Sequence, residues 1–386
     1  MKKKIIRITT VSGSLRDLLQ GQLKFMSNYF DMVAISSSGG SGWNLDKYGE
    51  SEGVKTIPIE MTRKITPIKD IIAVYKLYKV LRKEKPDVVH THTPKAGTLG
   101  MLAAKLAGVP YRLHTIAGLP LLVATGKKRI LLNFVEKVTY ACASKIYPNS
   151  NGLKQIILDQ KFTTEDKLKV IANGSSNGIN VSDFNPKDYS DTFKENLKSE
   201  LGIKPNDFVF LFVGRLVADK GINELIGAFD ELCKSNIKNI KLLLVGSYEE
   251  ELDPLSKNTL EIINTNQSII SSGWVNDVRP YYAVSNVLTF PSYREGFPNV
   301  VMQAGAMGLP CIVTDINGCN EIIIEGENGA IIPVKNKETL RLKMLEFSKE
   351  ELTFHNNDCR DLIVSRYSRE FVWNALLEEY NNLLGD

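Results

Sequence analysis

Short apolar segments rich in β-forming residues recur along this chain of 386 residues, and each is followed by a stretch with the apolar spacing of a helix. The clearest are Phe208–Val213 (FVFLFV) and Lys241–Val245 (KLLLV). Strands that are apolar at nearly every position are typical of parallel sheets covered by helices on both faces. The pattern therefore predicts an α/β fold. The length favours two domains, because one domain usually has about 100–150 residues.

The expected strands fall into two series. The first contains residues 4–10, 32–36, 54–58, 88–90, 111–116, 145–147 and 168–171, and the second adds residues 268–272, 287–290 and 311–314 to the two named above. Residues 185–206 are polar and turn-rich around a short charged helix, so we expect them to link the series. We expect doubly wound domains at 1–187 and 188–365 that face each other across a cleft, and a C-terminal helix at 366–386 that packs back toward the first domain.

Composition excludes several other classes of protein. Apolar residues make up 43% of the chain, which argues against disorder. The five cysteines are irregularly spaced and include no C-x-x-C pair, which indicates reduced thiols. The first residues are basic but lack the apolar stretch of a signal peptide, and no run of about 18 apolar residues could span a bilayer. We therefore expect a cytoplasmic protein.

Charge is divided unevenly between the halves. Residues 1–190 hold 29 Lys and Arg against 15 Asp and Glu (+14), whereas residues 191–386 hold 19 against 29 (−10). This asymmetry suggests that the first half meets an anionic partner. Basic and apolar residues interleave at 71–85 and 119–137, as in helices that lie on anionic lipid. The alternative is a core-facing helix with a solvated cationic side. Nucleic acid is not expected as a partner, since no aromatic–basic motif of a known module is present.

Glycines follow several expected strands, but the strand ends do not fit a dinucleotide motif, and the Walker pattern is absent. Another arrangement follows FVFLFV, where Gly214, Arg215, Lys220 and Gly221 precede an expected helix. Glycines let the main chain approach a ligand, a helix start offers free N–H groups, and two cations neutralise charge. This segment is therefore a candidate diphosphate site, with an ordinary surface turn as the alternative.

A second candidate segment runs from Pro291 to Pro310 and opens a helix near Asn299. Glu295 lies in the strand-to-helix loop, where it is expected to point into the cleft. Gln303 lies about one turn inside the helix and can hydrogen-bond a polyhydroxylated ligand. A third glycine turn, TDINGCNE, follows at residues 314–321.

These three segments (GRLVADKG, PSYREGFP and TDINGCNEII) resemble the donor-binding domain of family-4 glycosyltransferases. The resemblance covers essentially the whole chain and implies the GT-B fold, a retaining mechanism and no metal or other cofactor. In the first half, VVHTHTPKAGTLGMLAAKLAGVP and NGSSNGINVSDFNP resemble the bacterial subgroup that extends undecaprenyl-diphosphate-linked sugars, which includes an N-acetylgalactosaminyltransferase. The expected substrates are a UDP-sugar and an undecaprenyl-diphosphate-linked saccharide. The expected place is the cytoplasmic face of the inner membrane, in capsule or lipopolysaccharide synthesis.

The resemblance implies a role for each matching residue. Arg215 and Lys220 would grip the donor diphosphate and stabilise charge on the leaving nucleotide, and Glu295 would bind the donor sugar. Trp274 and Val275 would lie against the base. The family's E-x7-E motif is altered, because its second glutamate is Gln303 here, which leaves the nucleotide preference open. The rest of the donor site would be formed by Gly214, Gly296, Phe297, Pro298, Asn299 and Val300.

The first half departs from the family at a second position. Many relatives carry His-Gly after the strand at 111–116, and alignment on Gly118 puts Ala117 at the histidine position. His114 could replace that catalytic histidine only if the strand end is irregular, and a buried histidine with a backbone partner is the alternative.

Acceptor contacts are expected at the ends of the first-half strands. His90 and His92 flank Thr91 and could suggest a metal, but no third ligand is evident, so a structural or acceptor-contacting role is favoured. Lys95, at an expected helix start, is a candidate for the acceptor phosphates. The candidate acceptor residues are Gly13, Ser14, His92, Lys95 and Gly118.

Two other functions stay open. A sugar-nucleotide 2-epimerase would use a related two-domain fold and act on a UDP-sugar alone. A non-catalytic nucleotide-sugar-binding protein is suggested by the departures at Gln303 and Ala117.

Overall fold

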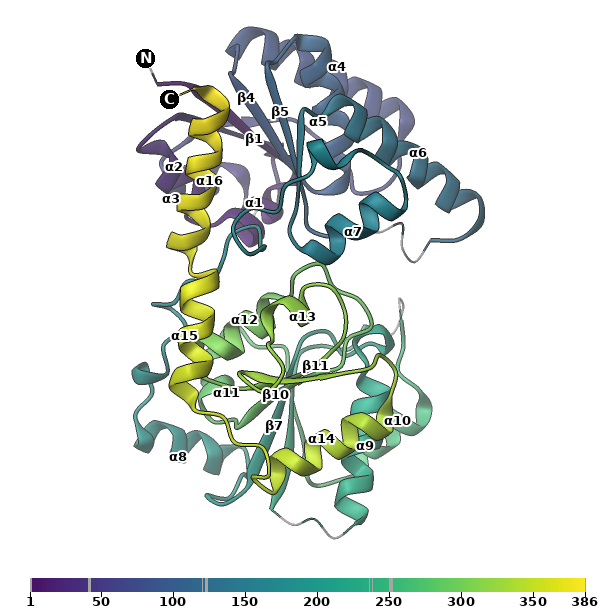
Figure 1. Ribbon diagram of the computed structural model, residues 1–386, viewed down its shortest axis with the longest axis vertical. Coiled ribbons are helices and arrows are strands. Elements are labelled where there is room, and N and C mark those ends of the chain that lie inside the picture. The colour runs from purple at the N-terminus through teal and green to yellow at the C-terminus, as the bar shows by residue number, and fades with distance from the viewer. Residues whose placement is uncertain are drawn as a thin grey trace. The chain divides into compact units, whose positions relative to one another are not determined.

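The computed structural model describes residues 2–40, 43–119, 121, 124–235, 237, 239–249 and 253–385. The chain divides into unit 1 (Met1–Gly178 with Arg369–Asp386) and unit 2 (Ile179–Ser368) (Figure 1). The division thus precedes the expected boundary at 187–188. The segment expected to be a linker belongs to unit 2, where its helix α8 (Asp191–Glu200) packs against α11 (Arg279–Ala283).

Unit 1 is built on a parallel sheet of six strands in the order β3-β2-β1-β4-β5-β6. This is the strand order of a doubly wound fold. Strands are added toward one edge of the sheet up to β3 and toward the other edge from β4 on. The prediction of a strand at 168–171 is wrong, because this segment forms only an isolated bridge between Leu168 and Ile146. The strands are β1 (Lys4–Val11), β2 (Asp31–Ser37), β3 (Lys55–Pro58), β4 (Val88–His92), β5 (Tyr111–Ile116) and β6 (Lys145–Pro148).

Helices cover both faces of this sheet (Figure 1). On one face, α4 (Pro67–Glu84), α5 (Pro94–Ala107) and α6 (Gly126–Cys142) pack side by side, and Ile6 and Ile8 of β1 belong to the core beneath them. Because side chains alternate along a strand, Ile5 and Arg7 face the opposite layer. That layer contains α1 (Ser12–Leu19), α2 (Gln22–Ser27), α3 (Leu45–Glu52) and α16 (Arg369–Leu384).

The expected helices form with different bounds. Residues 71–85 fall almost wholly within α4, whereas the helix expected at 119–137 begins only at Gly126; residues 120, 122 and 123 lie outside the described part of the chain. The terminal helix expected from residue 366 is divided at Ser368 into α15 (Asn356–Tyr367) and α16. No helix in the described ranges has the length and apolar character needed to cross a membrane.

Unit 2 has a second parallel sheet of six strands, in the order β12-β11-β10-β7-β8-β9. Its β7 is buried at every position after Phe208, as the continuous apolar run predicts. β12 was not predicted from the sequence. The strands are β7 (Phe208–Val213), β8 (Ile240–Val245), β9 (Ile269–Gly273), β10 (Val287–Phe290), β11 (Cys311–Thr314) and β12 (Gly329–Ile332).

The helices that flank the unit 2 sheet complete its core. α15 packs against α12, where a Cβ on Gly305 would lie 2.4 Å from Ile363. The helices not yet bounded are α9 (Ile222–Lys234), α10 (Lys257–Thr265), α12 (Asn299–Ala306), α13 (Cys319–Ile322) and α14 (Lys337–Ser348), with α7 (Asn151–Asp159) in unit 1.

Candidate functional site

The three glycine-containing loops singled out in the sequence follow β7, β10 and β11 in the unit 2 sheet. β7 and β10 are hydrogen-bonded neighbours although two strands lie between them in the sequence, so the strand order reverses at this point. Ligands of open α/β sheets usually bind beyond the carboxyl ends of the strands at such a reversal. The fold therefore brings the separate motifs to one place that suits a ligand.

Lys220, in the loop after β7, forms an ion pair with Glu295, in the loop after β10. Both side chains are 16% exposed. The Ser292 hydroxyl also donates to Glu295 Oε1 at 2.9 Å, and the Lys220 ammonium lies 5.6 Å from the centre of the Phe290 ring. The two predicted residues are thus held together with their charges partly shielded from water, which strengthens their interaction.

The neighbours of Glu295 add two further ties between the same loops. Arg294 Nη2 lies 2.6 Å from Asp219 Oδ2, and Tyr293 Oη donates to Glu224 Oε2 at 2.6 Å. Burial, together with the Glu224 carboxylate, raises the pKa of Tyr293, so its phenol keeps its proton at neutral pH. These four residues were given no role from the sequence. For three of them the available signal was the alternation of charged and polar residues in ADK and YRE, and for Glu224 there was none.

The main chains of these loops pack directly against one another at two glycines. Gly221 has φ +72°, and a Cβ there would lie 2.0 Å from the Pro291 carbonyl oxygen. Gly318 has φ +80°, and its Cβ would lie 2.6 Å from the Gly296 carbonyl oxygen. The Asn317 side chain donates to the Glu295 carbonyl. The three loops are therefore packed tightly against one another, and any side chain at Gly221 would clash with Pro291.

Arg215 and the residues expected near the base lie farther from this cluster. Arg215 is 47% exposed and pairs with Glu249, beyond β8, at 2.7 Å instead of joining Lys220 and Glu295. Trp274, beyond β9, is 70% exposed, and Val275 is half-buried. Gly214 follows β7 directly with φ +148°.

The remaining predicted donor residues shape the start of α12. Phe297 is buried, with its ring centre 5.4 Å from that of Tyr367, and Pro298 occupies the N-cap position. Asn299 and Val300 form the first turn. Gln303 is half-buried, and its Oε1 accepts a hydrogen bond of 3.1 Å from Tyr282 Oη. This contact uses the acceptor of the Gln303 amide and not its NH2 donor.

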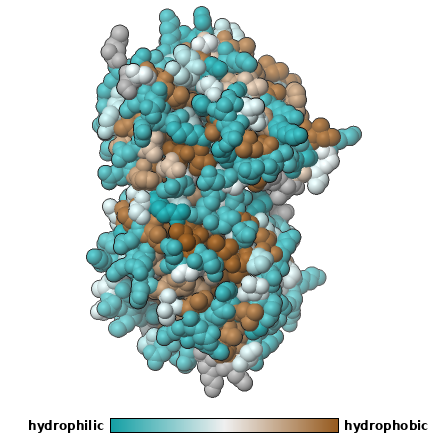
Figure 2. Space-filling model, in the orientation of Figure 1, coloured by the Kyte–Doolittle hydropathy of each residue, from teal (hydrophilic) through white to brown (hydrophobic). Residues whose placement is uncertain are grey.

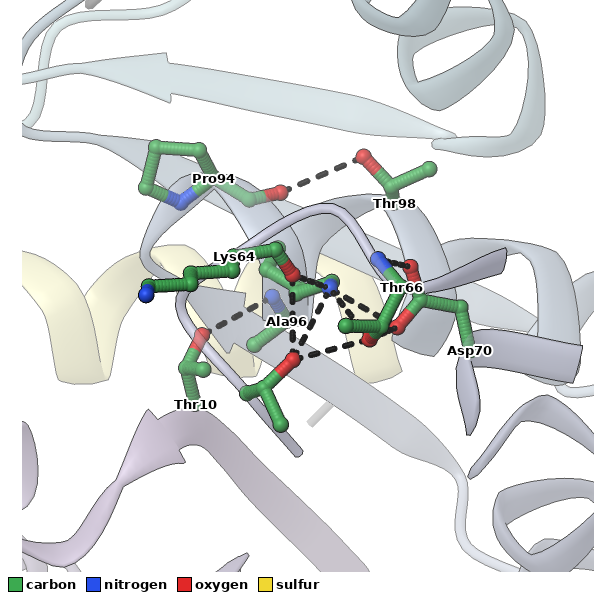
Figure 3. A network of polar contacts seen from close by, with 9 residues as sticks. Thr10, Lys64, Thr66, Asp70, Pro94, Ala96 and Thr98 are labelled. Atoms are coloured by element: carbon green, nitrogen blue, oxygen red, sulfur yellow. Dashed lines mark hydrogen bonds and ion pairs between the residues drawn. The ribbon is translucent and has the colours of Figure 1, made fainter. Parts of the chain in front are cut away.

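In unit 1, Lys95 near the start of α5 is held by neighbouring residues. Its Nζ lies 2.7 Å from Asp70 Oδ1 and donates to the Lys64 carbonyl, and the side chain is 14% exposed. Figure 3 shows this network, with Thr66 and Asp70 beside the main chain of Lys64. A phosphate that binds Lys95 would therefore compete with Asp70.

The main chain is open at the glycines predicted to contact the acceptor. Gly13 and Ser14 lie in the first turn of α1, and a Cβ on Gly13 or on Gly118 would meet no atom within 4 Å. Thr93 directly follows β4, the strand that lies between β1 and β5. It adopts φ +71°, which is rare for a residue with a side chain, and its hydroxyl lies 2.7 Å from Thr10 Oγ1. Backbone strain of this kind tends to occur at functional sites.

His114 is buried against α5. Its Nδ1 lies 2.8 Å from Thr91 Oγ1, and a Cβ on Gly97 would lie 2.3 Å from its ring. Burial lowers its pKa to about 4, so the ring is neutral at pH 7. This placement favours the packing alternative over contact with a substrate.

His90 and His92 stack with their ring centres 4.6 Å apart on the face of the sheet that α16 covers. His92 Nε2 lies 2.7 Å from Arg7 Nη2, and His90 contacts Tyr380 and Thr115 through its two ring nitrogens. Nowhere in the described ranges are three His, Cys, Asp or Glu side chains grouped to hold a metal.

Both units are similar to known proteins. Residues 16–150 match the family described as glycosyl transferase 4-like, and residues 193–364 match the glycosyl transferases of group 1. The chain is 33% identical over 386 residues to the capsular polysaccharide biosynthesis glycosyltransferase CapM of Staphylococcus aureus, covering 99% of this chain and 98% of that protein.

Two further relatives bear the names of defined transferases. A UDP-Gal:alpha-D-GlcNAc-diphosphoundecaprenol alpha-1,3-galactosyltransferase of Escherichia coli is 30% identical over 361 residues, covering 93% of this chain and 90% of that protein. An N,N'-diacetylbacillosaminyl-diphospho-undecaprenol alpha-1,3-N-acetylgalactosaminyltransferase of Campylobacter jejuni is 28% identical over 342 residues, covering 86% and 87%. The resemblance drawn from the motifs is confirmed.

Solved structures share the fold. Anabaena HepE in complex with UDP has a TM-score of 0.80 at 16% identity, covering 99% of this chain and 100% of that chain. A putative UDP-N-acetylglucosamine 2-epimerase of Listeria monocytogenes has a TM-score of 0.65 at 17% identity, covering 100% and 97%. The expected GT-B fold is confirmed, and these two likenesses by themselves do not separate a transferase from an epimerase.

Proposed function

The chain belongs to the group 1 glycosyl transferases, and on that basis we propose that it transfers a hexose or an N-acetylhexosamine from a UDP-sugar to a saccharide carried on undecaprenyl diphosphate. The names of the relatives from E. coli and C. jejuni support this substrate class, because both describe acceptors on diphosphoundecaprenol. CapM supports a role in the synthesis of a surface polysaccharide.

The observation that carries the proposal is the pairing of Lys220 with Glu295 where the strand order of unit 2 reverses. In the proposed reaction, an acceptor hydroxyl oxygen bonds to the anomeric carbon as the bond from that carbon to the UDP oxygen breaks. The hydroxyl proton passes to the departing phosphate. Lys220 and Arg215 stabilise the negative charge that grows on the diphosphate, and Glu295 accepts hydrogen bonds from the sugar.

The proposed reaction retains the anomeric configuration and needs no metal. Attack from the face that UDP leaves would retain the anomeric configuration. The charge on the leaving diphosphate would be balanced by Lys220, Arg215 and the N–H groups at the start of α9 and α12, without a metal or other cofactor. Donor binding would then divide Lys220 between Glu295 and the diphosphate, so the ion pair places the ammonium in advance.

We further propose that unit 1 docks on the anionic cytoplasmic face of the inner membrane through α4 and α6. Ile68, Ile71 and Tyr75 of α4 are 78%, 71% and 55% exposed, although Ala73, Leu77 and Leu81 of the same helix are buried. A helix with only a solvated cationic side would not expose these side chains. α4 therefore has a second apolar face, spaced i, i+3 and i+7.

α6 has the same character, with Ile130 at 70% and Phe134 at 64% exposure close to the exposed Lys127 and Lys128. Figure 2 shows apolar side chains among hydrophilic ones over the part of unit 1 where Figure 1 places α6. Apolar side chains that enter the interface and lysines that meet anionic headgroups are the two contributions that hold surface helices on membranes.

The test is a panel of UDP- and GDP-sugars incubated with lipid-diphosphate-linked mono- and disaccharides, with products identified by mass spectrometry. We expect one added sugar from a UDP-linked donor, and NMR of the product to show the donor's anomeric configuration. Conversion of a UDP-sugar without any acceptor would instead identify an epimerase. Binding of UDP without turnover on any acceptor would identify a non-catalytic binding protein.

A further inference from the structure

Arg7, on β1, is the largest fully buried side chain in the described ranges, and no carboxylate there forms an ion pair with it. Nη1 donates to Tyr380 Oη at 2.8 Å, and Nη2 donates to Gln22 Oε1 at 2.6 Å. Nε and Nη2 also lie 3.2 and 2.7 Å from His92 Nε2. All three partners are uncharged groups, and a buried charge without a counter-charge is costly.

These contacts fix the proton of His92. A guanidinium can only donate hydrogen bonds, so His92 Nε2 accepts and the ring proton resides on Nδ1. His92 is 2% exposed, and its Nδ1 has no partner. Burial and the Arg7 charge keep the pKa of His92 well below its usual range, so the ring stays neutral. An unpaired N–H donor therefore lies beside an unbalanced positive charge.

Arg7 and His92 line a cavity of about 20 Å³ within unit 1. Two other residues that line it, Ser176 and Asn149, each have a side-chain oxygen (Oγ and Oδ1) that is buried without a partner. The hydrogen bond from Asn149 Nδ2 to the Ala117 carbonyl is long, at 3.5 Å, so a half-turn of the amide that presents its NH2 to the cavity breaks only one weak hydrogen bond. A cavity needs about 10–15 Å³ to hold one water-sized occupant. This one admits a single small ion and is too small for a phosphate or a sugar.

We propose that the cavity binds one small monovalent anion of the size of chloride, held by the Arg7 guanidinium, the His92 Nδ1–H and the Ser176 hydroxyl. The anion supplies the counter-charge that Arg7 lacks. The cavity is too small for the groups of either proposed substrate, so His92 would bind the anion in place of the acceptor contact predicted for it from the sequence.

Bound there, the anion fastens two segments to the sheet of unit 1. The cavity walls include Val372 and Leu376 of α16 as well as Ser176. Gln22, which holds Arg7, also donates to the Ser176 carbonyl at 3.0 Å. Anion binding should therefore stabilise the docking of α16 and of the segment that leads out of unit 1.

The test is thermal unfolding of the full chain in sodium chloride and in sodium gluconate at equal ionic strength, with saturating UDP present to occupy the cationic loops of unit 2. We expect a saturable rise in Tm of about 2–4 °C at chloride tenfold above its Kd. Crystals soaked in sodium bromide should show an anomalous peak within hydrogen-bond distance of His92 Nδ1.

The decisive variant is Asn149→Asp, which places a carboxylate in the cavity and should abolish the dependence on chloride in a folded protein. Asn28→Asp makes the same change on the surface of unit 1 and should keep it. If Asn149→Asp does not fold, Ser176→Ala should raise the chloride concentration at half-effect about tenfold. Equal Tm values in the two salts, a chloride effect that Asn149→Asp or Ser176→Ala leaves unchanged, or a bromide-soaked crystal without a peak in the cavity would each overturn the assignment.

Discussion

Lys220 and Glu295 are 75 residues apart in the sequence and form an ion pair between the loops that follow β7 and β10. Ser292 and the main-chain contacts of Gly221 and Gly318 hold these loops in place. In the proposed reaction, the leaving diphosphate would meet a cation that is already oriented, which is the condition under which charge stabilisation is most effective.

Removal of either donor-site cation should stop catalysis without unfolding unit 2. We expect Arg215→Ala and Lys220→Ala each to lower kcat by at least about 10²–10³-fold, because in the proposed reaction each removes a charge that stabilises the leaving group. Turnover and far-ultraviolet circular dichroism measure the two effects. Lys343→Ala removes another lysine ion pair of unit 2 and should leave turnover unchanged. Near-normal activity in both site variants would remove them from the donor site.

Gly221→Ala should damage the site through its main chain. The added Cβ would lie 2.0 Å from the Pro291 carbonyl, so the loops must separate. Gly202→Ala is the matched control, since Gly202 has φ +69° but no atom within 4 Å of its Cβ. The control should cost only the strain of a left-handed alanine, about 1–2 kcal/mol. Urea unfolding and UDP titration should show a larger loss of stability and weaker UDP binding for Gly221→Ala. Equal losses in both variants would contradict the packing argument.

The exposed face of α4 should govern binding to membranes. Full burial of an isoleucine side chain contributes about 1.5–3 kcal/mol, so Ile68→Ser combined with Ile71→Ser should weaken binding to anionic liposomes more than tenfold. Added salt should weaken the binding of both proteins, because headgroup charge contributes. Leu342→Ser changes an exposed leucine of unit 2 and should have no effect in the same sedimentation assay. Undiminished binding of the double variant would rule out this face.

Acid should destabilise unit 1 through its buried histidines. Burial lowers the pKa of His114 to about 4, and lowers that of His90 and of His92. The unfolded chain therefore binds protons that the folded chain does not, so stability falls as pH drops from about 6.5 toward 4, by up to about 1.4 kcal/mol per pH unit for each histidine.

Urea unfolding at a series of pH values measures this slope. His114→Gln should make it shallower, whereas His355→Gln removes an exposed histidine and should not. A slope that is the same in all three proteins would show that His114 does not contribute.

The fold could be predicted because its signals are local. An apolar run such as Phe208–Val213 identifies a buried strand without reference to any other part of the chain. The two features that were not predicted, β12 and the break between α15 and α16, lack such local signals. β12 (Gly329–Ile332) is short and begins with a glycine that weakens the strand pattern, and the break at Ser368 interrupts a helical pattern that runs on without a glycine or proline.

Partners in the sites could not be predicted, because they depend on contacts between distant segments. Lys95 looked free for a phosphate, yet Asp70 from the preceding helix pairs with it. Arg215 was correctly placed after β7, but its partner Glu249 follows a different strand. The two-residue spacing of His90 and His92 predicts one shared face, and only the fold brings Arg7 beside them.

The place of α16 has a consequence for how the protein is made. This helix leaves the ribosome after all of unit 2, yet its Tyr380 hydroxyl accepts a hydrogen bond from Arg7 beneath the first sheet. During translation, Arg7 and part of the hydrophobic layer beside it therefore stay uncovered until α16 has been made. Unit 2 can finish first, so the order of completion runs against the order of synthesis.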